Sequence, residues 1–160
     1  MTIGIFEHRF SVSGSVRKVA AFHYDSRAFH CLVPPGCFLR VHHQQPLADN
    51  TVNQFTVWVG PVAVSWKAVH SEVGETGFVD TQLAGPMKSW VHRHTFERVS
   101  DNRTTVVDRV AYEHFPGWRG IRSRILFANT SLKILFAWRA WATRQGVRSI
   151  CCDRQDSQSS

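Results

Sequence analysis

Hydrophobic and polar residues alternate along several segments of this chain, a pattern typical of β-strands with one buried face. The breaks between these segments hold turn formers such as Gly60-Pro61 and Gly85-Pro86. The pattern predicts seven strands, at residues 5–12, 37–45, 52–59, 62–73, 78–83, 88–99 and 104–114. Because the last six follow one another through short connections, we expect an antiparallel meander.

Apolar residues recur at helical spacing in the rest of the chain. A helix that begins at Ser13 or Ser15 is expected to run to about residue 26, with a short helical turn over 28–32. A long helix is expected over about 120–145, with Gly146 as its end. The apolar stripe expected to face the sheet comprises Ile121, Ile125, Ala128, Leu132 and Leu135 or Phe136.

This order of elements predicts an α+β protein with the helix-grip fold. A seven-stranded antiparallel sheet would wrap around the long C-terminal helix, with two short helices after the first strand. A helix of about 25 residues spans ~40 Å, which is long enough to cover the sheet. With 160 residues, 43% of them hydrophobic, the chain suits one domain at 1–146, followed by a polar, disordered tail at 147–160.

The strands on either side of Gly85-Pro86 carry polar and aromatic residues where a hairpin normally buries aliphatic ones. Successive strand residues point to opposite faces, so Asp80 shares a face with Phe78, and His92 shares a face with His94. If these faces point inward, the protein encloses a pocket. The predicted cavity residues are Trp66, His70, Asp80, Gln82, Trp90, His92, His94, Phe96, Asp108 and Tyr112, with Leu132 and Phe136 from the helix.

Three runs in these strands resemble a known superfamily. They are Phe78-Val-Asp-Thr-Gln-Leu-Ala-Gly-Pro86, Trp90-Val-His-Arg-His-Thr-Phe96 and Asp108-Arg-Val-Ala-Tyr112. The series resembles the ligand-binding SRPBCC domain proteins of the START-like superfamily, which includes the birch-pollen-allergen and polyketide-cyclase families. The resemblance covers about residues 3–145, and Met87 stands where the family usually has Phe. It implies the helix-grip fold and an apolar or amphipathic small ligand, which some relatives convert.

Three interpretations of the polar residues stay open. They could form a buried network that satisfies itself, contact a ligand directly, or hold a metal ion through His92, His94 and an aspartate. A lone His-x-His is a weak metal signal, so no metal or cofactor is expected. Neither a nucleophile motif nor a phosphate-binding loop is present. The four cysteines lack zinc-ligand spacing and stand at Cys31, Cys37, Cys151 and Cys152.

The function expected first is non-catalytic binding of a hydrophobic or amphipathic small molecule. The alternative is a polyketide cyclase- or dehydratase-like enzyme that works by acid–base catalysis. Its candidate catalytic residues are His92, His94, Asp80, Asp108 and Tyr112. A third interpretation rests on the net charge of +7, with a basic surface that binds nucleic acid or anionic lipid. The basic residues are scattered, so nucleic acid is not the partner we expect.

The long helix carries a second apolar set that one sheet cannot easily cover. Either the two short helices cover it, or it forms the interface of a homodimer. Its members are Phe127, Ile134, Trp138 and Trp141. No transmembrane run or signal-peptide start is found, so a cytoplasmic location is expected.

Overall fold

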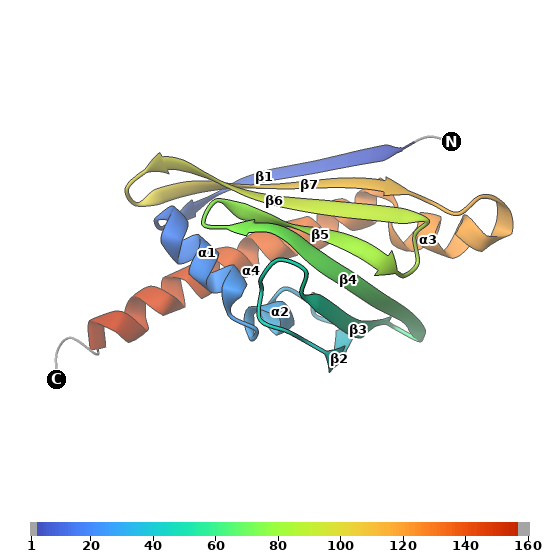
Figure 1. The fold of residues 1–160 in the computed structure, drawn as a ribbon, viewed down its shortest axis with the longest axis horizontal. Coiled ribbons are helices and arrows are strands. Elements are labelled where there is room, and N and C mark those ends of the chain that lie inside the picture. Colours follow the sequence, from blue (N-terminus) through green and yellow to red (C-terminus); the bar gives the residue numbers. More distant parts are fainter. Residues whose placement is uncertain (1–2, 157–160) are drawn as a thin grey trace.

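Seven strands form one antiparallel sheet in the computed structural model of the protein, which describes residues 3–156. Their spatial order is β1-β7-β6-β5-β4-β3-β2 (Figure 1). The strands are β1 (Gly4–Ser13), β2 (Cys37–His43), β3 (Val52–Val59), β4 (Val62–Gly74), β5 (Gly77–Ala84), β6 (Ser89–Ser100) and β7 (Arg103–Glu113). Strands β2 to β7 form the expected meander, and β1 completes the sheet by pairing with β7.

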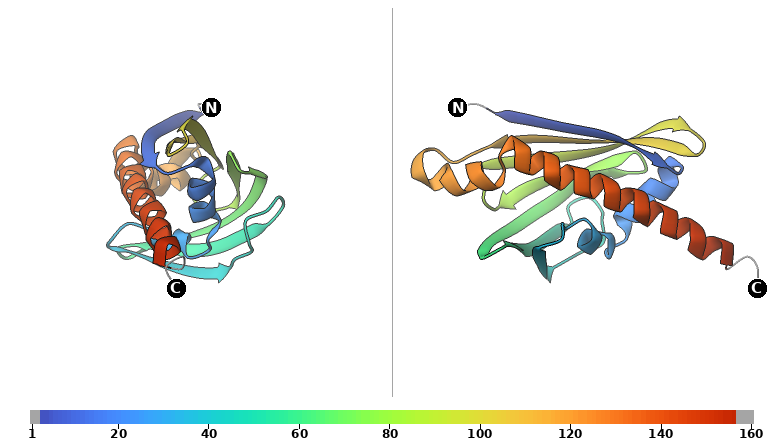
Figure 2. Two further views of the ribbon diagram at one scale, coloured as in Figure 1. Left: turned by 90° about the vertical axis from the view of Figure 1, so that its left-hand side faces the viewer. Right: turned by 180° about the vertical axis from the view of Figure 1, so that it is seen from behind.

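Two short helices follow β1, and the chain is mainly helical after β7. The helices are α1 (Val16–Tyr24), α2 (Ala28–Cys31), the 3₁₀ helix η1 (Gly117–Gly120), α3 (Ile121–Leu126) and α4 (Asn129–Asp156). The Ser15 hydroxyl accepts a hydrogen bond from the Lys18 backbone N–H and so caps α1. Helix α4 crosses the concave face of the curved sheet (Figure 2). The predicted helix-grip fold is thereby confirmed.

The long helix differs from the predicted one at both ends. The backbone leaves the helical region at Phe127 (φ −113°, ψ 31°), so α3 and α4 are separate helices. Helix α4 continues through Gly146, and 147–156 of the predicted tail belong to it; the tail residues 157–160 lie outside the described residues. A Cβ at Gly146 would lie 2.1 Å from the Phe22 ring. Glycine therefore permits close packing of α1 on α4 and does not end the helix.

The face that α4 presents to the sheet is only partly the predicted stripe. Leu132 and Phe136 are 1% and 0% exposed, as expected for gripping residues. Ile121 and Ile125 lie in α3, before the break at Phe127, and are 52% and 68% exposed. None of the helices within residues 3–156 combines the length and apolar character needed to cross a bilayer.

The register of the central strands decides which side chains face α4. Asp80 pairs with His92 across β5 and β6, and His94 pairs with Asp108 across β6 and β7. His92 and His94 are each 3% exposed, whereas the intervening strand face points outward and leaves Val91 38% exposed. The predicted inward orientation of the two histidines is confirmed.

Candidate functional site

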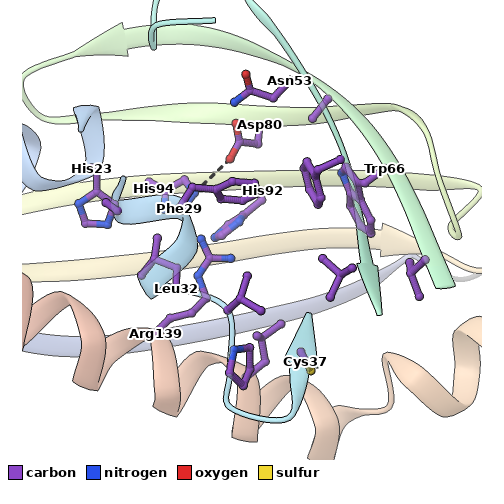
Figure 3. Close-up of a pocket in the computed structure, with 18 of the residues that line it drawn as sticks. His23, Phe29, Leu32, Cys37, Asn53, Trp66, Asp80, His92, His94 and Arg139 are labelled. Atoms are coloured by element: carbon purple, nitrogen blue, oxygen red, sulfur yellow. Dashed lines mark ion pairs between the residues drawn. The ribbon is translucent and has the colours of Figure 1, made fainter. Parts of the chain in front are cut away.

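A cavity of about 690 Å³ lies between the sheet, α2 and α4 (Figure 3). Large apolar side chains of its wall include Phe29, Leu32, Phe55, Trp66, Phe78, Trp90, Leu126, Phe127, Leu132 and Leu135. Aromatic rings pack edge to face along the wall, with centroids 5.4 Å apart for Trp66 and Trp90. The exposed side chains of Ile125 and Ile134 also line the cavity, so it opens to solvent beside α3 and α4.

A group of polar side chains from β4 to β7, which we term the polar cluster, forms one part of this wall together with the carboxylate of Asp108 behind it. It comprises His70, Asp80, His92, His94 and Asp108. The Nε2 of His92 donates to Oδ1 of Asp108 over 3.0 Å, and His94 Nδ1 lies 2.8 Å from the same oxygen. Asp80 Oδ2 lies 3.4 Å from His94 Nε2, and Asp80 Oδ1 lies 3.1 Å from His70 Nε2. The two carboxylates thus bridge all three imidazoles.

His94 stands between the two carboxylates without an aligned hydrogen bond to either. Both of its ring nitrogens and Asp80 Oδ1 are buried and lack a well-directed partner among the described residues. The distances of His94 to Asp80 and Asp108 are nevertheless those of ion pairs. Charge attraction, which requires a protonated His94, therefore holds this part of the cluster together.

The charges of four groups in the cluster, Asp80, His92, His94 and Asp108, follow from their burial and their neighbours. Burial would raise the pKa of Asp108, but contact with His92 and His94 outweighs burial and holds that pKa well below its usual value. The pKa of Asp80 is lowered against its burial in the same way, chiefly by His94. Burial lowers the pKa of His92 to about 4, aided by the charge on His94. For His94 itself, the two carboxylates outweigh burial and raise the pKa.

His23 of α1 lines the cavity next to His94 of the polar cluster, and sequence reasoning did not assign it to the site. Its ring centroid lies 6.0 Å from that of His94, and its Nδ1 donates to the Val19 carbonyl oxygen over 2.9 Å. Burial lowers its pKa to about 4, aided by the charge on His94. The available signal was its place beside the apolar face of the first helix.

The predicted cavity residues fall into two groups, those that line the cavity and those that do not. Those at the cavity surface are Trp66, His70, Asp80, Trp90, His92, His94 and Leu132. The others do not line the cavity: Phe96, Asp108 and Phe136 are buried, and Gln82 and Tyr112 are half-buried. Gln82 donates from Nε2 to the Met87 carbonyl oxygen over 2.8 Å and holds the β5–β6 connection. Asp108, by contrast, contacts His92 and His94 and so orients two groups that face the cavity.

Three members of the polar cluster could also hold a metal ion. One ligand atom from each of Asp80, His92 and His94 lies within 4.8 Å of the others. Asp108 would orient both imidazoles, as a carboxylate often does for metal-bound histidine. The residue types suit a divalent transition metal. A protonated His94 would instead pair with Asp80 and Asp108 by charge attraction, so the same side chains also suit a site without a metal.

An antiparallel sheet that grips a long helix around a cavity defines the helix-grip class of proteins. No protein-family model matches the chain, and no curated protein matches it. Many solved structures share its fold.

One similar structure is the Zhui aromatase/cyclase from Streptomyces sp. R1128, with a TM-score of 0.73, 13% identity, and 92% of this chain and 94% of that chain covered. Norcoclaurine synthase from Thalictrum flavum, in complex with dopamine and hydroxybenzaldehyde, gives a TM-score of 0.68, 12% identity, and 92% and 88% coverage. Ara h 8.0201 gives a TM-score of 0.60, 10% identity, and 88% and 98% coverage. These structures, each at 13% identity or less, confirm the fold that the resemblance implied.

Proposed function

We propose that the protein binds a hydrophobic or amphipathic small molecule in the cavity between the sheet and α4. The observation that carries this proposal is the cavity itself, of about 690 Å³, with a mainly apolar wall and a few convergent polar groups. Small-molecule sites are typically ~300–1,000 Å³ and built in this way. The similar fold of norcoclaurine synthase, solved with dopamine and hydroxybenzaldehyde, supports a small-molecule ligand.

Filling the cavity tests this proposal. Ala68 of β4 is 5% exposed and lines the cavity, whereas Ala63 of the same strand is exposed and is not part of the wall. We expect Ala68→Phe to weaken binding of the neutral fluorescent probe N-phenyl-1-naphthylamine at least tenfold, and Ala63→Phe to leave it unchanged. Equal effects of the two substitutions, or no probe binding by the unaltered protein, would contradict the proposal. Native mass spectrometry of purified protein would show any co-purifying apolar molecule.

The second candidate function is cyclase- or dehydratase-like acid–base turnover of the bound molecule. It is supported by the opposite pKa shifts of His92 and His94, which face the cavity side by side with ring centroids 3.8 Å apart. Neighbouring groups with separated pKa values can act as base and acid. The test is deuterium exchange α to the carbonyl of added 2-dodecanone. If the protein accelerates exchange above the rate in buffer, and His94→Gln abolishes that acceleration, turnover is supported. If the protein does not accelerate exchange, carriage alone is favoured.

The homodimer expected from the sequence stays a proposal, with a smaller candidate interface. The ring centroids of Phe127 and Trp90 lie 5.6 Å apart, and Trp138 Nε1 donates to the Cys31 carbonyl oxygen over 3.2 Å. Phe127 and Trp138 therefore have contacts within the chain. Ile134 and Trp141 are 65% and 49% exposed. An interface there would lie beside the cavity mouth, because Ile134 also lines the cavity.

A further inference from the structure

Arg139 is a cationic side chain in the cavity wall that has no anionic partner. It projects from α4 towards His92 (Figure 3) and lines the cavity. Its guanidinium carbon lies 5.5 Å from the centroid of the Phe136 ring. Among the described residues, no carboxylate pairs with it and no acceptor receives its hydrogen bonds. The fixed donors of the guanidinium are therefore available to a molecule in the cavity.

Arg144 of the same helix shows what is unusual about Arg139. Its guanidinium carbon lies 5.3 Å from the centroid of the Phe10 ring, a contact of the same kind. Arg144 also donates from Nε to the Ser11 carbonyl oxygen over 3.0 Å, so the fold itself uses its donors. Arg144 does not line the cavity. The two residues thus share a helix and an aromatic contact and differ in cavity access and in partners.

The surroundings of Arg139 combine neutral imidazoles with a long apolar wall. Its charge contributes to the lowered pKa of both His23 and His92, which places the guanidinium near the polar end of the cavity. Trp66 lies away from this end (Figure 3). A ligand that satisfied both parts would carry one charged group and an apolar body.

We propose that the cavity takes an amphipathic carboxylic acid, whose carboxylate pairs with the Arg139 guanidinium while its apolar body lies along the wall formed by Trp66 and Trp90. This inference rests on the proposed function, because it specifies the ligand class of the same cavity. A guanidinium matches a carboxylate with two parallel hydrogen bonds.

The acidic members of the polar cluster favour a monoanion over a dianion. Asp80 faces the cavity and Asp108 lies directly behind it, both with a lowered pKa and hence ionised at neutral pH. His94 compensates one of these charges, so the cluster adds a net negative charge beside Arg139. A phosphate monoester, with close to two negative charges, would meet stronger repulsion than a carboxylate.

Three ligands that share a dodecyl chain test the inference by displacement of N-phenyl-1-naphthylamine: dodecanoic acid, dodecanol and dodecyl phosphate. We expect the acid to bind about tenfold or more tightly than the alcohol, and more tightly than the phosphate. Arg139→Met keeps the apolar stem over Phe136, and should reduce acid affinity about tenfold or more while alcohol affinity changes less than twofold. Arg144→Met, the matched control, should change neither.

The outcomes separate the two proposals. Tight binding of the alcohol with no preference for the acid would overturn the carboxylate inference and leave small-molecule binding in place. The inference would also be overturned if Arg139→Met still preferred dodecanoic acid to dodecanol, or if dodecyl phosphate bound more tightly than dodecanoic acid. Failure of all three ligands would remove the proposed function and the inference together. If Arg139→Met does not fold, Arg139→Lys can replace it, because lysine keeps the charge but lacks the planar guanidinium. A preference for the acid that falls with Arg139→Lys but not with Arg144→Lys would support the inference, and an unchanged preference would overturn it.

Discussion

Lowering the pH from 7 to 5 is expected to destabilise the protein through two histidines beside the cavity, the buried His92 and the half-buried His23. His23 and His92 each have a pKa of about 4, because burial and the charge on His94 disfavour their protonated forms. In the unfolded chain both return to the ordinary value of 6.5. Between these values the unfolded chain binds protons that the folded protein excludes. Their stabilising effect is therefore present above pH 6.5 and lost as the pH falls towards 4.

The magnitude follows from the two pKa values. At pH 5 the linkage relation gives about 2 kcal/mol for each histidine, hence about 4 kcal/mol for the pair. His94 acts in the opposite sense near pH 7, because its raised pKa keeps it protonated in the folded protein while the unfolded residue loses its proton. The carboxylates of Asp80 and Asp108 scarcely titrate in this range in either state, since their pKa values are lowered from 3.8. The net decrease expected in the free energy of unfolding between pH 7 and pH 5 is roughly 3 kcal/mol.

Urea unfolding at pH 5, 6 and 7 and constant ionic strength measures this dependence. His92→Gln keeps a donor for Asp108 but removes one titrating group, so the loss on acidification should fall by about half. It should also lower the free energy of unfolding at pH 7 by about 1–3 kcal/mol, because the partners are less well satisfied. His30→Gln, at an exposed histidine, is the control and should follow the unaltered protein. The lowered pKa values of His23 and His92 would be refuted by either of two results. One is a loss of less than about 1 kcal/mol in the free energy of unfolding of the unaltered protein between pH 7 and pH 5, and the other is an undiminished loss in the His92→Gln variant.

Three further predictions concern packing and assembly. Phe136→Ala should lower the free energy of unfolding in urea by about 3–5 kcal/mol, because its ring is fully buried, while the exposed-site control Lys133→Ala should change it by less than about 0.5 kcal/mol. Gly146→Ala should destabilise by about 1–3 kcal/mol because its methyl group meets the Phe22 ring; stabilisation, as helix propensity alone predicts, would contradict this packing. Sedimentation at micromolar concentration should show a dimer that Trp141→Glu dissociates; a monomeric unaltered protein would end the dimer proposal.

The strand faces were predictable because the period of a strand is fixed by its geometry. Once His92 and His94 were placed inward, Val91 and Arg93 had to point outward, and the structure agrees. Placing Asp108 beside His94 required only that β6 and β7 form a hairpin. These inferences depend on local alternation and short turns, both of which are properties of the sequence.

The helical contributions to the site were not predictable in the same way. Arg139 and His23 face the cavity because of the angles at which α4 and α1 cross the sheet, and no local pattern encodes those angles. Gly146 looked like a helix end because its contact with Phe22 is made across the tertiary structure. Local reasoning also joined α3 to α4, since the apolar spacing continues through the break at Phe127.

The polar cluster bears on the choice between carriage and catalysis. Well-packed apolar residues often stabilise a core as well as a buried ion network does, so stability alone gives weak grounds for a cluster of this kind. Its chemistry is more specific: a neutral His92 and a protonated His94 lie side by side at the cavity surface, while Asp108 fixes both rings from behind. A carrier of an amphipathic acid needs only Arg139 and the apolar wall. An acid–base catalyst also needs proton transfer at the cavity surface, so exchange that depends on His94 would separate the two functions.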